Sequence, residues 1–335
     1  MKGRSLLTAL CISAAIVLGS PTGAHAETKN IYGVFWRGCE EVCRGFQDYI
    51  SDAGMDVEFV IRDAQQDAAM LPIFLREARD MKVDLILTWG TSATLGVVGT
   101  LDDVGKAKFN NDIPHVFTVV ADPVGVGLVK SLEKTNRANV TGTFNRVPEA
   151  VNIKTIRSYK PSFKRLGLLY NANEPNSTLM RDEITALTKE MDFELVAIEL
   201  ELGSDGRPRV DDIPVKVAAL KDAGVDFIYL GSSSFLDTNR DVFTGAAVKL
   251  GLPVLSPYER LVRDSEALFS IAARYFDVGR LAGTQARKIL VDGMVPGDIP
   301  VARMTDFAYV VNMEVARKLN LFPPVAILQF AETVN

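Results

Sequence analysis

Short apolar segments alternate with amphipathic segments along most of this chain, and this alternation constrains the fold more than any other feature. Segment 84–89 is almost wholly apolar, as expected for a strand that is buried on both faces of a parallel sheet. Segment 69–81 repeats apolar side chains at helical spacing. Because parallel strands need helical crossovers between them, this order predicts an α/β fold with right-handed connections.

The order of segments occurs twice, and the two halves also match in sequence. Segment 84–92 (DLILTWGTS) parallels segment 226–233 (DFIYLGSS), and each closes a run of alternating strands and helices. Each half of this kind can form its own doubly wound parallel sheet. The sequence therefore predicts two α/β lobes.

Strand and helix patterns late in the sequence indicate that the chain returns to both lobes. Segment 268–272 has the pattern of a strand, segment 277–290 that of a helix, and segment 309–311 that of a short strand. We therefore expect three crossings between the lobes, which together form a hinge. The crossings are expected near residues 143–148, 272–276 and 304–307, with lobe 1 formed by residues 27–144 plus 272–304 and lobe 2 by residues 145–271 plus 305–335.

The first 26 residues have the pattern of an export signal. Lys2 and Arg4 precede an apolar segment, 6–18, that is shorter than the roughly 20 residues of a membrane-spanning helix. Segment 24–26 (AHA) then forms a small-x-small cleavage site. This pattern predicts a signal peptide over residues 1–26, cleaved before Glu27. We expect a soluble protein that is exported to the periplasm of a Gram-negative bacterium.

Composition and motifs argue against several function classes. The 335 residues carry a net charge of −5 without a tract of lysine or arginine, so we expect no nucleic-acid partner. Removal of the signal peptide would leave His115 as the only histidine of the chain. Its position at the start of a strand predicts a structural role. The chain also lacks the serine-nucleophile, zinc-protease and phosphate-loop motifs. We therefore expect no catalysis, no cofactor and no metal site.

Two cysteines, Cys39 and Cys43, remain in the exported chain. An oxidising compartment permits a disulfide between them. Within one helix their Cβ atoms would lie about 5–6 Å apart, whereas a disulfide requires roughly 3.5–4.5 Å. The bridge can form only if one cysteine lies in the loop before the helix, and both the bridged and the free states remain open.

Ligands of open parallel sheets bind beyond the carboxyl ends of the strands, where helix N-termini attract anions. Several predicted strands here end in loops with polar or aromatic side chains, whereas Trp89 is expected in the core. The hydroxyl groups in these loops can equally be helix caps, and Asp122 can equally shape a turn. The candidate ligand-binding residues from these loops are Trp36, Arg37, Thr91, Ser92, Asp122, Asn173, Ser232, Ser233, Tyr258 and Glu259.

Four segments together resemble a known family. They are 90–93 (GTSA), 121–128 (ADPVGVGL), 139–142 (NVTG) and 169–177 (LYNANEPNS). They resemble the ABC transporter substrate-binding proteins of the tryptophan/tyrosine type, in order and over nearly all of the exported chain. The resemblance implies the fold of type I periplasmic binding proteins. It also implies a cleft that contains Thr91, Ser92, Asp122, Asn173, Asn176 and Ser177.

The chain departs from the family pattern near the expected cleft. Pro257-Tyr258-Glu259-Arg260 follows a strand after which the family often has acidic residues. Arg37 and Arg260 add positive charge there, which favours a ligand with an extra anionic group over an aromatic amino acid.

The expected function is capture of a small organic solute, amino-acid-like or carboxylate-bearing, by a monomer that delivers it to an ABC permease with its ATPase. A sensory receptor for a membrane kinase or chemoreceptor is the alternative, and a periplasmic enzyme is a weaker one. The sequence leaves the identity of the ligand open.

Overall fold

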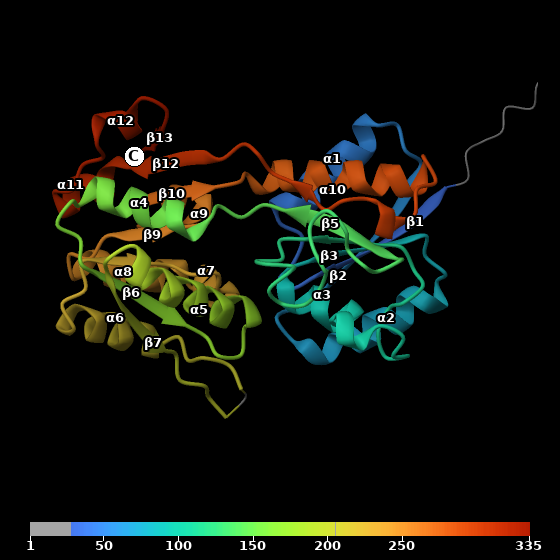
Figure 1. Ribbon diagram of the computed structural model, residues 1–335, viewed down its shortest axis with the longest axis horizontal. Helices are drawn as coiled ribbons and strands as arrows, with labels where there is room; N and C mark the ends of the chain where they lie inside the picture. The colour runs from blue at the N-terminus through green and yellow to red at the C-terminus, as the bar shows by residue number, and fades with distance from the viewer. Residues whose placement is uncertain (1–27, 205) are drawn as a thin grey trace, which may run out of the picture.

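The computed structural model describes residues 28–204 and 206–335, which form two α/β lobes side by side (Figure 1). The predicted signal peptide lies outside the described residues. Each lobe is built around its own sheet, and helices cover the faces of the sheet. Within the described part of the chain, no helix is both long enough and apolar enough to cross a membrane.

The first sheet has six strands in the order β11-β5-β4-β3-β1-β2, and its neighbouring strands are parallel. Its strands are β1 (Lys29–Phe35), β2 (Val57–Asp63), β3 (Leu85–Trp89), β4 (His115–Thr118), β5 (Val140–Phe144) and β11 (Ala302–Arg303). The α-helices of this lobe are α1 (Glu41–Asp52), α2 (Leu71–Asp80), α3 (Thr91–Val98) and α10 (Tyr275–Leu290).

The second sheet has seven strands in the order β13-β12-β10-β9-β8-β6-β7. Its strands are β6 (Arg165–Tyr170), β7 (Glu194–Glu199), β8 (Phe227–Tyr229), β9 (Val254–Ser256), β10 (Phe269–Ala272), β12 (Ala308–Asn312) and β13 (Glu332–Val334). Its helices are α4 (Glu149–Tyr159), α5 (Pro175–Glu190), α6 (Asp212–Asp222), α7 (Ser234–Thr238), α8 (Arg240–Lys249), α9 (Glu259–Arg263), α11 (Met313–Leu319) and α12 (Val325–Leu328).

The chain crosses between the lobes three times, from β5 to α4, from β10 to α10 and from β11 to β12 (Figure 1). The predicted fold class, two α/β lobes joined by a three-crossing hinge, is therefore confirmed. One detail differs, because β12 enters the second sheet from the first lobe and lies antiparallel to β10. The second sheet is thus mixed rather than wholly parallel. The residue limits of the two lobes stay a prediction.

Helices α1 and α10 pack backbone against backbone in the first lobe (Figure 1). A Cβ atom on Gly279 would lie 2.0 Å from the carbonyl oxygen of Val42, and one on Gly45 would lie 1.9 Å from that of Phe276. Real carbon and oxygen atoms cannot approach so closely, so only glycine fits at both positions. This contact fixes α10, which begins at the second crossing, onto the helix that follows the first strand.

A disulfide joins Cys39 and Cys43, whose Cα atoms are 5.1 Å apart. Cys39 lies in the loop before α1, and Cys43 lies in the first turn of the helix. This is the arrangement in which the sequence spacing allows a bridge. The disulfide ties the β1–α1 loop to the start of α1.

Replacing both cysteines by serine is expected to lower the free energy of unfolding by about 2 kcal/mol, because a loop this short restricts the unfolded chain only moderately. Urea unfolding of the variant and of the natural protein measures this difference. Dithiothreitol should produce the same shift in the natural protein and none in the variant. Equal stability of the two proteins without reductant would contradict the prediction.

Candidate ligand-binding cleft

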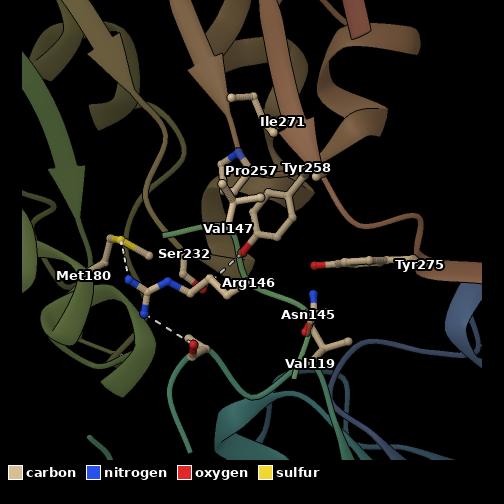
Figure 2. Close-up of a pocket in the computed structure, with 12 residues that line it drawn as sticks. Val119, Asn145, Arg146, Val147, Met180, Ser232, Pro257, Tyr258, Ile271 and Tyr275 are labelled. Atoms are coloured by element: carbon tan, nitrogen blue, oxygen red, sulfur yellow. Dashed lines mark hydrogen bonds between the residues drawn. The ribbon is translucent and has the colours of Figure 1, made fainter. Parts of the chain in front are cut away.

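Two adjoining pockets lie between the lobes, at the carboxyl ends of strands from both sheets. The hinge pocket has a cavity volume of about 40 Å³ and is lined by residues of the first two crossings, among them Arg146 and Tyr275 (Figure 2). The tryptophan pocket has a cavity volume of about 20 Å³ and is lined by Trp36 and Trp89 among others. Sites for small molecules occupy about 300–1,000 Å³, so the lobes are closed here with little free space between them. The two share Val119, Ser232, Tyr258 and Tyr275 and therefore form one cleft.

Most of the candidate residues predicted from the sequence lie together in this cleft. Lobe 1 contributes side chains that follow β1 and β3, and lobe 2 contributes side chains that follow β6, β8 and β9. Their contact with a ligand stays a prediction. The candidates that line the cleft are Trp36, Arg37, Thr91, Ser92, Asn176, Ser232 and Tyr258.

Two candidate serines lie outside both pockets, because their hydroxyl groups bind the local backbone. The Oγ of Ser177 accepts a hydrogen bond from the Asn171 N–H at 3.0 Å. The Oγ of Ser233 accepts one from the Leu236 N–H at 3.3 Å and caps α7. The capping alternative therefore describes Ser233, whereas Ser177 holds the loop before α5.

Three further candidates also lie outside the two pockets. Asp122 accepts a hydrogen bond from the N–H two residues ahead and shapes a turn. Asn173 donates to the carbonyl oxygen of Gly206 at 2.6 Å. Glu259 accepts a hydrogen bond from Arg263 one helical turn ahead, at 2.6 Å. Each of these side chains has a hydrogen-bond partner away from the two pockets, and its contact with a ligand stays a prediction.

Several residues that line the cleft were not predicted to do so. Trp89 is only 3% exposed, as expected of a core residue, yet it also lines the tryptophan pocket. Its position directly before the Gly90 loop could have revealed this. Tyr275 and Arg146 line the cleft from two of the expected crossings, and no candidate residue was predicted in either crossing. Val119 has a φ of 53°, which is strained for a β-branched residue and typical of functional sites.

Glycine at position 90 allows the cleft wall to form. Gly90 has a φ of 94°, a conformation that L-residues rarely adopt, and it makes the turn from β3 into α3. A Cβ atom there would lie 3.3 Å from the Cβ of Trp36. The turn therefore brings Thr91 and Ser92, at the start of α3, to the cleft beside Trp36.

Four charged side chains join the lobes beside the tryptophan pocket, and we call them the interlobe cluster. Arg37 and Glu40 belong to lobe 1, and Asp237 and Arg260 belong to lobe 2. Arg37 pairs with Asp237, and its Nη2 lies 3.3 Å from the carboxylate of Glu40. Arg260 donates to Asp237 at 2.7 Å and to Glu40 at 2.9 Å. Opposite charges thus alternate across the closed cleft.

The guanidinium of Arg37 is both buried and charged. Its side chain is 6% exposed and lies over the ring of Trp89, 4.8 Å from the ring centroid. Burial disfavours the charged form, but the carboxylates of Asp237 and Glu40 raise the pKa of Arg37 above its ordinary value. Its Nε and Nη1 atoms, and Nε1 of Trp89, have no hydrogen-bond partner among the described residues. Buried donors of this kind favour the binding of an acceptor.

A model of the ABC transporter substrate binding protein family matches residues 36–335. The chain belongs to this family. The family resemblance predicted from the sequence is thus confirmed, and so is the type I periplasmic-binding-protein fold, which solved neighbours share.

Individual relatives are similar to this substrate-binding protein over most of its length. The tyrosine-binding protein of Clostridioides difficile is 25% identical over 284 residues, which cover 83% of this chain and 76% of that protein. A conserved domain protein of Vibrio cholerae has a TM-score of 0.81 at 22% identity and covers 92% of this chain and 100% of its own. The ABC domain from Streptococcus pneumonia in complex with L-Trp has a TM-score of 0.78 at 21% identity and covers 91% and 100%. The two structures show a common fold.

In the parts of this family member that the structure describes, no group of three or more metal-ligating side chains lies together. His115, 0% exposed, shares a hydrogen bond of 2.9 Å with the Thr88 hydroxyl in the core, and burial lowers the pKa of His115 to about 3. The cleft provides hydrogen-bond donors and aromatic faces, and the interlobe cluster joins its two walls. These are the elements of a binding site.

The carboxyl group of Glu174 makes stability depend on pH. Burial raises the pKa of Glu174 from 4.5 to about 7. Between these values the folded state binds a proton that the unfolded state has lost, so stability from this group is full below pH 4.5 and falls as pH rises through 7. Glu174→Gln is expected to remove this part of the pH dependence. Urea unfolding between pH 4.5 and 8 tests it, and identical pH profiles for the two proteins would count against the assignment.

Proposed function

We propose that this chain is a periplasmic solute-binding protein that captures a small, carboxylate-bearing or amino-acid-like solute between its lobes and delivers it, as a monomer, to an ABC importer. The observation that carries the proposal is the buried guanidinium of Arg37, which lines a cleft formed by both lobes and keeps two N–H groups without a partner among the described residues. Membership of the substrate-binding family supports it. The names of relatives that bind tyrosine or L-Trp support a solute of this size and chemistry.

The proposed location follows from the sequence signal and is supported by the disulfide. We propose that residues 1–26 are removed on export and that the chain acts in the periplasm. The bond between Cys39 and Cys43 suits an oxidising compartment.

A thermal-shift screen of small carboxylates and amino acids tests the function. A ligand present at 100 times its Kd is expected to stabilise the protein by about 2.7 kcal/mol. The bound ligand should be recovered unchanged, and deletion of the gene should abolish its uptake by the cell. Turnover of the ligand, or uptake that does not depend on the protein, would contradict the proposal.

A further inference from the structure

The charges that line the cleft differ from those that an amino acid requires. Among the described residues that line the two pockets, the charged side chains are Arg37 and Arg146 alone. Neither pocket has an aspartate or glutamate in its lining. A zwitterionic ligand would therefore find a cation for its carboxylate and no anion for its ammonium group.

The two arginines differ in the donors that remain for a ligand. Arg146 is saturated, because it pairs with Glu149 and Glu183 and donates to the carbonyl oxygen of Ala121 at 3.3 Å. Arg37 uses Nη2 for the interlobe cluster and keeps Nε and Nη1 without a partner among the described residues. These two atoms lie on different edges of the guanidinium, because each bidentate edge includes Nη2, so a carboxylate can accept a single charge-assisted hydrogen bond from one of them.

Further groups around Arg37 also favour an anion. Thr91 and Ser92 line the same pocket at the N-terminus of the eight-residue helix α3, where backbone N–H groups attract negative charge. The Nε1 donor of Trp89 is buried there without a described partner. Side-chain donors and the start of a helix thus line the same pocket.

An ammonium group would be poorly accommodated in this cleft. Asp237 and Glu40, the carboxylates beside Arg37, are both shared with Arg260 in the interlobe cluster. Glu174 is buried outside the lining of either pocket. Its Oε1 accepts a hydrogen bond from the Phe235 N–H at 3.0 Å, and its Oε2 has no hydrogen-bond partner among the described residues. A second cation in a closed cleft that already contains Arg37 would be desolvated and repelled.

The remainder of the cleft suits an apolar or aromatic group. Tyr258 and Tyr275 meet edge to face with ring centroids 6.1 Å apart, and both line the two pockets. Beyond them, Val147, Ile271 and Met180 line the hinge pocket (Figure 2). Aromatic faces with aliphatic neighbours favour a flat or branched hydrocarbon body.

We propose that the ligand is a carboxylic acid with an aromatic or apolar body and without an ammonium group, and that Arg37 binds its carboxylate. This inference rests on the proposed function and narrows it to one class of solute. The proposed ligand class differs from the tyrosine and the L-Trp that the names of two relatives contain.

Calorimetric titration with matched pairs of ligands tests this class. The pairs are 3-(4-hydroxyphenyl)propionate with tyrosine, 3-(indol-3-yl)propionate with tryptophan, and 4-methylpentanoate with leucine. In each pair the two molecules differ only by the ammonium group. At least one deamino acid is expected to bind ten or more times more tightly than its amino acid.

The outcomes separate this inference from the proposed function. If an amino acid binds as tightly as its deamino partner or more tightly, the inference is wrong, while solute binding stands. If Glu174→Gln then removes that preference, Glu174 is the partner of the ammonium group. If none of the six compounds binds, the inference is also wrong, and the wider screen alone decides whether the protein binds a solute.

Variants of the anion-binding arginine complete the test. Arg37→Gln is expected to weaken binding of the preferred deamino acid by at least tenfold. Arg37→Gln with Asp237→Asn should show the same loss without an unpaired charge in the cluster. Arg62→Gln, which removes a partly exposed arginine of the same lobe, should leave the affinity unchanged. Full affinity in the folded double variant would overturn the role of Arg37.

Discussion

Replacing Asp237 by alanine is expected to lower the stability of the closed protein by about 3–5 kcal/mol, because removal of one partner from a buried ion pair leaves the other charge uncompensated. The Asp237 side chain is 1% exposed and is shared by Arg37 and Arg260. Without it, two guanidinium groups would face each other across the cleft with only Glu40 between them. Urea unfolding measures the loss, and small-angle scattering should show a larger radius as the lobes separate.

A surface aspartate provides the matched control for this variant. Asp211 also pairs with an arginine, Arg209, but its side chain is 84% exposed. Asp211→Ala should therefore change stability by less than about 1 kcal/mol. If Asp237→Ala also lowered stability by less than about 1 kcal/mol, the interlobe cluster would not hold the lobes together.

Gly279→Ala is expected to destabilise the first lobe by about 3 kcal/mol, at the upper end of the range for overpacking. The new methyl group would lie 2.0 Å from the carbonyl oxygen of Val42, so α10 must move away from α1. Alanine favours the helical conformation over glycine by about 1 kcal/mol. A net loss of stability would therefore show that the steric clash with α1 outweighs this gain in helix propensity. Urea unfolding provides the measurement.

A helical glycine of the second lobe serves as the control for this effect. A Cβ atom on Gly245, in α8, would meet only the end of the flexible Glu266 side chain, at 3.3 Å. Gly245→Ala should therefore leave stability unchanged or raise it slightly. If Gly279→Ala behaves in the same way, the two helices are not held at backbone contact.

Much of the fold could be predicted, because long-range order follows here from local patterns. The alternation of apolar strands with amphipathic helices predicted the two lobes, and the late strand patterns predicted the return crossings. Helix α4 was missed because its buried face is partly polar. Glu149 and Asn152 are buried there, and Asn152 donates to the Tyr229 hydroxyl at 3.2 Å. A hydrophobic pattern cannot reveal a buried helix face whose polar side chains are hydrogen-bonded.

The candidate site was predictable only in part, for a related reason. The strand-end rule places a loop near the cleft and does not say which of its side chains point inward. Arg37 and Thr91 line the tryptophan pocket, whereas the Glu259 side chain turns to Arg263. The pairing of Arg37 with Asp237 depends on how the lobes meet, and no local pattern encodes that contact.

The backbone contact between α1 and α10 has a consequence for the order of events when the cleft opens. Helix α1 follows the disulfide-tied loop that carries Arg37, and α10 starts with Tyr275 of the cleft wall. We therefore expect these parts to move as one rigid body, and opening to withdraw Asp237 and Arg260 from them. A solute bound by Arg37, as proposed above, is expected to stay on lobe 1 at that moment, so that lobe 1 sets the rate at which it leaves after the lobes have parted.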